Sequence, residues 1–374
     1  MTSWRDRRIL DLFGIDLPII QAPMAGATSV EMVVATALAG GLGSLPSAQL
    51  NVDELKTAIR SIRASTRAPL NLNFFAHHAP PVDAVAQMRW RALLAPYYVE
   101  LDLDPAAPVS GAGRAPFDAA FCEVVEEYRP EVVSFHFGLP DKALVDRVKA
   151  AGAKVVSSAT TVAEAVWLET NGADAVIAMG AEAGGHRGNF LTQDMSTQVG
   201  TMALVPQVVD AVSVPVIAAG GISDGRGAAA ALMLGASAVQ IGTAYLFCPE
   251  AKIPAVHAQA LANAADDSTA ITNVFTGRPA RGIVNRLVQE LGPISKKVPP
   301  FPTAGAALSP IRAKAEMSSR NDFTNLWSGQ AAKLAPRMSA FDLTRSLYEA
   351  ALMVIEGRSC PDIGGTDRPP GSRS

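Results

Sequence analysis

One histidine stands in a glycine-rich turn that directly follows a short apolar run. The segment 175–188 reads AVIAMGAEAGGHRG, and its histidine is His186. The apolar residues 175–179 predict a buried strand, and the following glycines let a ligand approach the backbone closely. The carboxyl end of a buried strand is where α/β proteins place their chemistry. A catalytic histidine and an incidental histidine in a surface loop fit this segment about equally well.

Two further glycine-rich turns follow predicted strands, and they could bind an anion. They read AAGGIS (218–223) and QIGTAY (240–245). Their backbone N–H groups would be open to a phosphate, and a helix beginning near Asp224 would add a favourable dipole. Turns made only for packing are the competing interpretation, but two such loops favour a phosphate-bearing cofactor. The residues concerned are Gly220, Gly221, Gly242 and Thr243.

Polar and small residues at other predicted strand ends could hold a flat ring. Asn71 and Asn73 lie on one face of the strand NLNFF (71–75), where an amide could bind a heterocycle or tie down a loop. In QAPMAG (21–26) a ring could lie on the backbone around Pro23 and Met24. A plain strand-to-helix turn explains that segment as well.

A second histidine, His136, lies in SFHFG (134–138) at the end of another predicted strand. It alternates with two phenylalanines, so it faces the opposite way from them. His136 therefore lies either near a cavity or in the core as a satisfied histidine. The remaining histidines, His77, His78 and His257, carry no motif, and no acid pair or metal-ligand spacing stands out.

Eight strand-like runs alternate with helix-like stretches along the chain, which predicts a parallel sheet. Eight such units favour a (β/α)₈ barrel. An open doubly wound sheet is the alternative, but no G-x-G-x-x-G follows the first strand. The predicted strands are 18–24, 41–47, 68–75, 131–138, 153–159, 173–180, 214–221 and 237–247.

Long segments outside the minimal barrel predict a helical lid over the active-site face. The first is 77–130, and the second separates the eighth strand from a predicted closing helix. The expected division is a barrel core over 1–248, an inserted lid and substrate subdomain over 249–337, the closing helix over 338–357 and a disordered tail over 358–374.

Composition narrows the class of protein. The chain has 374 residues, 49% of them hydrophobic, and a net charge of −3, so no basic surface suggests nucleic acid. Its three cysteines are far apart, which argues against disulfides and zinc and fits a cytoplasmic protein. We find no signal-peptide pattern, and polar residues interrupt the most apolar stretch, 228–247, so no membrane span is expected.

Taken in order, PIIQAPMAG, NLNFF, SFHFG, EAGGHRG, AAGGIS and QIGT resemble the nitronate monooxygenases, formerly called 2-nitropropane dioxygenases. SFHFG and EAGGHRG together look like the class I branch, and LWSGQ (326–330) is a weaker echo. The resemblance implies a TIM barrel that binds FMN and uses O₂ to oxidise alkyl nitronates to carbonyl compounds and nitrite. It implies His186 as the catalytic base, His136 as a substrate-pocket residue, and flavin contacts from Asn73, Gly184, Gly221, Gln240, Ile241, Gly242 and Thr243.

One position departs from the family pattern. Relatives often carry a glutamine before the acidic AGGH turn, and this chain has Met179 there. A backbone contact to the flavin could survive, whereas an amide contact could not.

Other functions remain open at the level of sequence. An NAD(P)H-dependent FMN reductase acting on quinones or enoyl thioesters would share these loops, and so would a non-catalytic flavin-binding barrel. An inosinate-type dehydrogenase needs a cysteine after the sixth strand, where this chain has none. The physiological nitronate, a role in detoxification and the oligomeric state also stay open.

Overall fold

The computed structural model describes residues 6–81, 83–109 and 114–358. Eight parallel strands form its central sheet, as the strand–helix alternation predicts. Nearly all of their residues are buried, because the inner face meets the barrel interior and the outer face meets helices. The strands are β1 (Ile19–Gln21), β2 (Gly43–Pro46), β3 (Leu70–Phe75), β4 (Val132–His136), β5 (Lys154–Ala159), β6 (Ala175–Met179), β8 (Val216–Ala219) and β9 (Ala238–Ile241).

The order of the strands shows that the sheet closes. It runs β1-β9-β8-β6-β5-β4-β3-β2, and a parallel bridge between Ile20 and Leu42 joins the two ends. The predicted (β/α)₈ barrel is therefore confirmed. The predicted eighth strand was too long, because β9 ends at Ile241 and the chain turns into the 3₁₀ helix η2 (Thr243–Phe247). Tyr245 of η2 turns into the core, where its hydroxyl lies 2.8 Å from Thr344 Oγ1.

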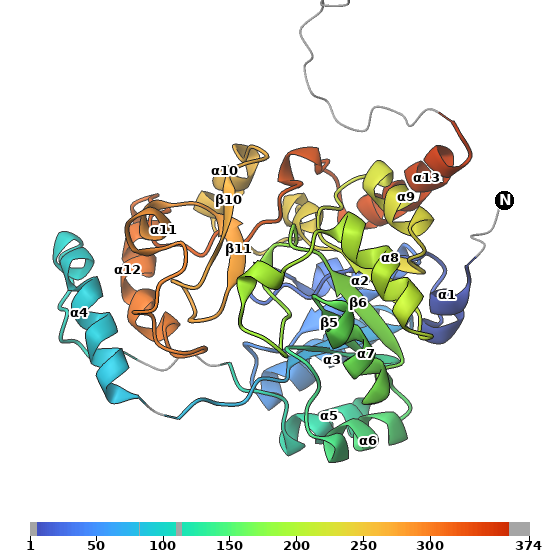
Figure 1. Ribbon diagram of the computed structural model, residues 1–374, viewed down its shortest axis with the longest axis horizontal. Helices are drawn as coiled ribbons and strands as arrows, with labels where there is room; N and C mark the ends of the chain where they lie inside the picture. Colours follow the sequence, from blue (N-terminus) through green and yellow to red (C-terminus); the bar gives the residue numbers. More distant parts are fainter. Residues whose placement is uncertain (1–5, 82, 110–113, 359–374) are drawn as a thin grey trace, which may run out of the picture.

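Helices follow the strands and cover the barrel (Figure 1). Helix α1 (Arg8–Phe13) differs from them, because its apolar residues pack with residues from the amino-terminal parts of several strands, such as Val132 and Ala175. It thereby closes the amino end of the barrel and leaves the carboxyl end for a site. The surrounding helices are α2 (Val30–Leu38), α3 (Val52–Ser65), α5 (Ala119–Tyr128), α6 (Lys142–Ala150), α7 (Val162–Thr170), α8 (Thr201–Ala211), α9 (Gly225–Met233) and α13 (Ala340–Ile355).

A second body of structure, which we call the lid, is formed mainly by the chain between η2 and α13. Its small antiparallel sheet has the order β10-β11-β7. The short strand β7 (Gly185–His186) belongs to the loop after β6, so backbone pairing ties the lid to the predicted catalytic loop. The other lid elements are α10 (Ala255–Ala262), β10 (Thr269–Thr272), β11 (Ala280–Ile283), α11 (Arg286–Leu291), α12 (Gly305–Met317) and η3 (Ala332–Leu334).

Helix α4 (Ala84–Glu100) leaves the barrel and packs on the lid, at the end of the molecule opposite α1 (Figure 1). The Trp90 indole donates a hydrogen bond to the Ala304 carbonyl at 3.1 Å, and the Tyr98 hydroxyl donates to the Ala307 carbonyl at 2.6 Å. Apolar residues of α4, α11 and α12 form one cluster apart from the barrel cores. The lid therefore has a core of its own, and α4 is part of it.

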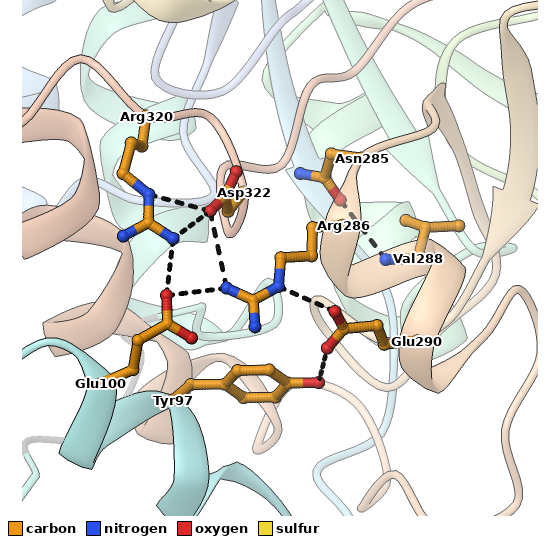
Figure 2. Close-up of polar contacts among 8 residues, drawn as sticks. All are labelled: Tyr97, Glu100, Asn285, Arg286, Val288, Glu290, Arg320 and Asp322. Carbon is orange, nitrogen blue, oxygen red and sulfur yellow. Dashed lines mark hydrogen bonds and ion pairs between the residues drawn. The ribbon is translucent and has the colours of Figure 1, made fainter.

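Charged side chains hold the outer edge of this packing (Figure 2). Arg286 of α11 lies 2.8 Å from both Glu100 of α4 and Glu290, and Arg320 lies 2.7 Å from Glu100. The Tyr97 hydroxyl donates to Glu290 at 2.6 Å. Within the described residues, no helix is long and apolar enough to cross a membrane. The expected disordered tail lies, from residue 359 onward, outside the described residues.

Candidate active site

A cavity of about 430 Å³ opens at the carboxyl ends of the barrel strands, beneath the lid. It brings together residues from six widely separated motifs. Of the residues predicted to contact cofactor or substrate, only Ile241 does not line the cavity, because its side chain is buried in the barrel core. The predicted residues that line the cavity are Pro23, Met24, Asn73, His136, Met179, Gly184, His186, Gly220, Gly221, Gln240, Gly242 and Thr243.

His186 is held at both its backbone and its ring. The backbone belongs to β7, where His186 pairs with Ala280 of β11. The ring Nε2 lies 2.9 Å from the hydroxyl of Thr276, between β10 and β11. The lid thus fixes a side chain that the barrel motif carries, and Nδ1 has no hydrogen-bond partner among the described residues. Nδ1 is therefore the nitrogen available to a ligand.

His136 also lines the cavity, but both of its ring nitrogens are engaged. Nδ1 lies 2.9 Å from the Ser158 hydroxyl, and Nε2 lies 3.0 Å from the backbone carbonyl of His186. Since a carbonyl only accepts, Nε2 carries the proton. Burial lowers the pKa of His136 to about 3, which keeps the ring neutral. His136 supports the His186 loop directly, and only its carbon edge is left for a substrate.

Two half-buried arginines make the surroundings of His186 positive. Arg114 lines the cavity, and Arg278 places its guanidinium 3.8 Å from the centre of the Phe137 ring. Burial lowers the pKa of each to about 10, so both remain cationic at neutral pH. Neither forms an ion pair within the part of the chain that the structure describes, and Arg114 Nη1 and Arg278 Nε are buried without partners.

Burial and these positive charges have a common effect on His186. Burial is the main reason why its pKa falls well below the usual value, and the charges of Arg114 and Arg278 lower it further. A neutral imidazole can accept a proton at pH 7, whereas an imidazolium cannot. The environment therefore keeps His186 neutral and able to accept a proton, while the lowered pKa also makes it a weaker base than a free imidazole.

The loop after β8 offers three consecutive backbone donors toward the cavity. The N–H groups of Gly221, Ile222 and Ser223 donate to no acceptor among the described residues. Gly220 and Gly221 have φ of +111° and +70°, which favours glycine at both positions. Orphaned N–H groups in a glycine-rich loop form a suitable site for one phosphate.

Helix α9 does not add its N-terminus to this site as expected. The carboxylate of Asp224 accepts from the N–H groups of Arg226 and Gly227 at 3.0 and 3.1 Å. This cap occupies the first turn and places a negative charge there. Gly242 lines the cavity with φ of −109°, so the backbone needs no glycine there for conformational reasons, and its contact with a cofactor stays a prediction.

Amide groups at the cavity floor are free to meet a heterocycle. Asn73 Nδ2 donates to Ser134 Oγ at 3.0 Å, which leaves its Oδ1 without a described partner. The Gln240 amide lines the cavity and makes no hydrogen bond to a described residue. Asn71, by contrast, donates to Ser44 at 2.9 Å and ties β3 to β2. For Asn71 the structure therefore supports a structural tie and not contact with a heterocycle, the two roles that the sequence left open for these asparagines.

Arg187, which follows His186, is fully buried and fixes the predicted catalytic loop to the barrel. Its guanidinium donates to the carbonyls of Met179 and Gly180 at 2.9 and 2.8 Å, and Nε donates to Gln198 at 2.7 Å. The carbonyl of Met179 is thereby engaged, so a backbone contact between Met179 and a flavin would have to share this oxygen or use another atom.

The lid and the segment before α5 place residues around His186 that were not predicted from the sequence. They have no motif and lie far from it in sequence, so no local pattern marked them. His77, assigned no role, is buried with its ring 4.8 Å from that of Phe301, and both of its nitrogens lack partners among the described residues. The principal missed residues are Arg114, Thr276, Arg278, Phe301 and Trp327.

Comparisons with known proteins find close sequence relatives over most of the chain. The family model described as nitronate monooxygenase matches residues 6–350. A nitronate monooxygenase of Paraburkholderia phytofirmans is 40% identical over 353 residues, which is 94% of this chain and 96% of that protein. One from Pseudomonas aeruginosa is 39% identical and covers 91% of this chain and 98% of its own length.

Solved structures show the same relationship. Nitroalkane oxidase from Streptomyces ansochromogenes superposes with a TM-score of 0.85 at 35% identity, covering 94% of this chain and 99% of that one. FabK from Thermotoga maritima superposes with a TM-score of 0.71 at 28% identity, covering 95% and 98% respectively.

Proposed function

This chain belongs to the nitronate monooxygenase family, and we propose that it oxidises alkyl nitronates with FMN as cofactor and O₂ as oxidant. The carbonyl compound and nitrite are the proposed products. The observation that carries the proposal is the combination of a neutral His186 with Arg114, a cation that has no carboxylate partner among the described residues, in a cavity that is also lined by a loop with free N–H groups.

The floor of the cavity fits FMN in chemical character. Gly221, Ile222 and Ser223 would hold the phosphate, and Asn73 and Gln240 would meet the polar edge of the ring. A loop that offers three donors and no cation suits a single phosphate ester. When bound, FMN supplies the electron-accepting chemistry through which a nitronate and O₂ react.

The wall around His186 fits an anion. A nitronate carries its charge on the two nitro oxygens, and the Arg114 guanidinium lines the cavity with an unpartnered Nη1. For a neutral nitroalkane, His186 Nδ1 would remove the α-proton while Arg114 stabilises the charge that develops on the nitro group. For a preformed nitronate, His186 would serve to orient the substrate.

The test is the visible spectrum of the purified protein, followed by titration with ethyl nitronate without oxygen. We expect a yellow protein that releases FMN on denaturation, loses its flavin absorbance with ethyl nitronate, and forms nitrite once air is admitted. A colourless protein that takes up no FMN would contradict the cofactor assignment.

The same experiment separates an alternative, a NAD(P)H-dependent reduction of quinones or enoyl thioesters. Similarity to FabK, at 28% identity over most of both chains, motivates including it. Bleaching by NADH or NADPH, without any response to ethyl nitronate, would favour that alternative over nitronate oxidation.

A further inference from the structure

Thr276 is buried, with 2% of its surface exposed, and its hydroxyl reaches the catalytic-loop histidine from the lid. Its Oγ1 lies 2.9 Å from His186 Nε2. The other polar groups near this hydroxyl belong to the backbone of Arg278, whose carbonyl and N–H each lie 3.4 Å away. The contact with His186 is therefore the closest interaction that this hydroxyl makes.

A neutral imidazole carries one proton, and a hydroxyl can either donate to it or accept from it. The surroundings distinguish the two arrangements. Nδ1 has no partner among the described residues, and Arg114 lines the same cavity as His186, where its positive charge favours a lone pair over a proton on the nitrogen that faces the cavity. On the opposite side, an Nε2–H can donate to Thr276 while the hydroxyl proton turns to the Arg278 carbonyl.

We infer that Thr276 is a positioning residue that holds His186 as the Nε2–H tautomer, so that the Nδ1 lone pair faces the cavity and receives the substrate proton. In this arrangement Nε2 is hydrogen-bonded to Thr276 of the lid, and Nδ1 is free to react with the substrate. The catalytic role of Nδ1 rests on the proposed function, whereas the tautomer itself does not.

The tautomer can be measured directly in the FMN-loaded protein with ¹⁵N-labelled histidine. His186→Asn identifies the His186 signals by their disappearance. We expect Nε2 to show the shift of a protonated, pyrrole-type nitrogen and Nδ1 that of an unprotonated one. In Thr276→Val, which removes the hydroxyl at nearly constant shape, we expect a mixture or the Nδ1–H form, and Thr276→Ser should restore the wild-type signals.

Two results of this measurement would overturn the inference. One is a wild-type His186 protonated at Nδ1, and the other is a tautomer that Thr276→Val leaves unchanged. Because the measurement needs no turnover, a failure of nitronate oxidation would not be mistaken for a failure of the inference. Circular dichroism and FMN content establish that each variant is folded and loaded, and Thr276→Ala, which also removes the hydroxyl, replaces the valine variant if that variant does not fold.

Kinetics test the role of the tautomer. We expect Thr276→Val to lower turnover of nitroethane about tenfold, because a wrong tautomer removes part of the roughly 10²- to 10⁴-fold that a general base supplies. Turnover of ethyl nitronate should be essentially unchanged, and the serine variant should recover turnover of nitroethane. Equal losses on the two substrates would overturn the positioning role. A wild-type enzyme active on ethyl nitronate but inert toward nitroethane would overturn the base assignment and leave the proposed function standing.

Discussion

The two walls of the cavity differ in what they are made of. The barrel wall consists of strand ends and glycine-rich turns, such as 218–223, and it presents mainly backbone groups and short amides. The lid wall includes large side chains such as His257, Arg312 and Trp327, from a region without a strand-by-strand repeat. Thr276 and Phe301, also from the lid, contact His186. His186 joins the walls, because a barrel loop carries it and lid residues pair with its backbone and ring.

This difference suggests how the site divides its work. Backbone donors fixed by parallel strands suit a constant group such as a phosphate, because little can move them. Bulky lid side chains can differ among relatives without disturbing the barrel, so they suit the selection of substrate. The variants proposed below change the barrel wall, the junction between barrel and lid, or the lid separately.

The largest effect is expected from the barrel wall, with Gly221→Val. The φ of +70° at Gly221 strains a β-branched residue, and an added Cβ would lie 3.3 Å from the Cβ of Glu182. The loop must shift, and its N–H groups then no longer converge. We expect complete loss of FMN retention with the fold kept, as measured by flavin absorbance and circular dichroism.

Gly152→Val is the matched control for Gly221→Val, since Gly152 has φ +97° and nothing within 4 Å of the added Cβ. Retention of stoichiometric FMN by Gly221→Val would place the phosphate elsewhere.

The next effect is expected at the junction, with His186→Asn. Asparagine keeps a polar group but cannot act as a base at neutral pH. Turnover of nitroethane should fall roughly 10²- to 10⁴-fold at unchanged FMN content, and turnover of ethyl nitronate should fall less. Similar losses on both substrates would point to orientation or electrostatics. If His186→Asn kept wild-type activity on both nitroethane and ethyl nitronate, His186 would have no part in the mechanism.

The barrel wall was largely predictable because each of its features is local. An apolar run, a glycine turn and the next helix lie within about 15 residues, and parallel packing brings all strand ends to one face. The motifs around Pro23, Asn73, His186, Gly221 and Gly242 therefore converge as the barrel hypothesis requires. Even there, Ile241 turns into the core and Asp224 takes the helix end expected for an anion.

The lid wall was not predictable for the opposite reason. Thr276 lies 90 residues beyond His186 in the sequence, and their contact depends on β7 pairing with β11. A two-residue strand has no detectable periodicity. Helix α4 illustrates the same limit, since its apolar residues indicate burial but do not indicate that the partner is α12.

A smaller effect, on stability, is expected where the barrel meets the lid at His77. Burial is the main cause that lowers the pKa of His77 to about 4, against an ordinary value of 6.5. The unfolded chain then binds the proton more tightly, so stability is full above pH 6.5 and falls as the pH drops toward 4. Between pH 7 and pH 5, protonation linked to His77 should lower the free energy of unfolding by about 2 kcal/mol. His77→Leu should flatten that part of the curve in urea unfolding, whereas His78→Asn, at the exposed neighbour, should not. Parallel curves for wild type and His77→Leu would contradict the assignment.

The smallest effect is expected within the lid, at the ion pairs of Figure 2. Hydrogen bonds from Arg286 and Arg320 lower the pKa of Glu100 to about 2 from the usual 4.5. The contribution of Glu100 to the free energy of unfolding is therefore complete above pH 4.5 and is lost as the pH falls through about 2.

Because these side chains are about one-third exposed, Glu100→Gln should lower the free energy of unfolding by no more than about 1 kcal/mol at pH 7 and by less in high salt. Hydrogen exchange should show the loss in α4 and not in the barrel strands, since α4 packs on the lid alone. Asp146→Asn, which breaks the exposed Lys142–Asp146 pair on α6, is the control and should leave α4 unchanged. If α4 exchanged at the wild-type rate in Glu100→Gln, apolar packing rather than charge would hold it to the lid.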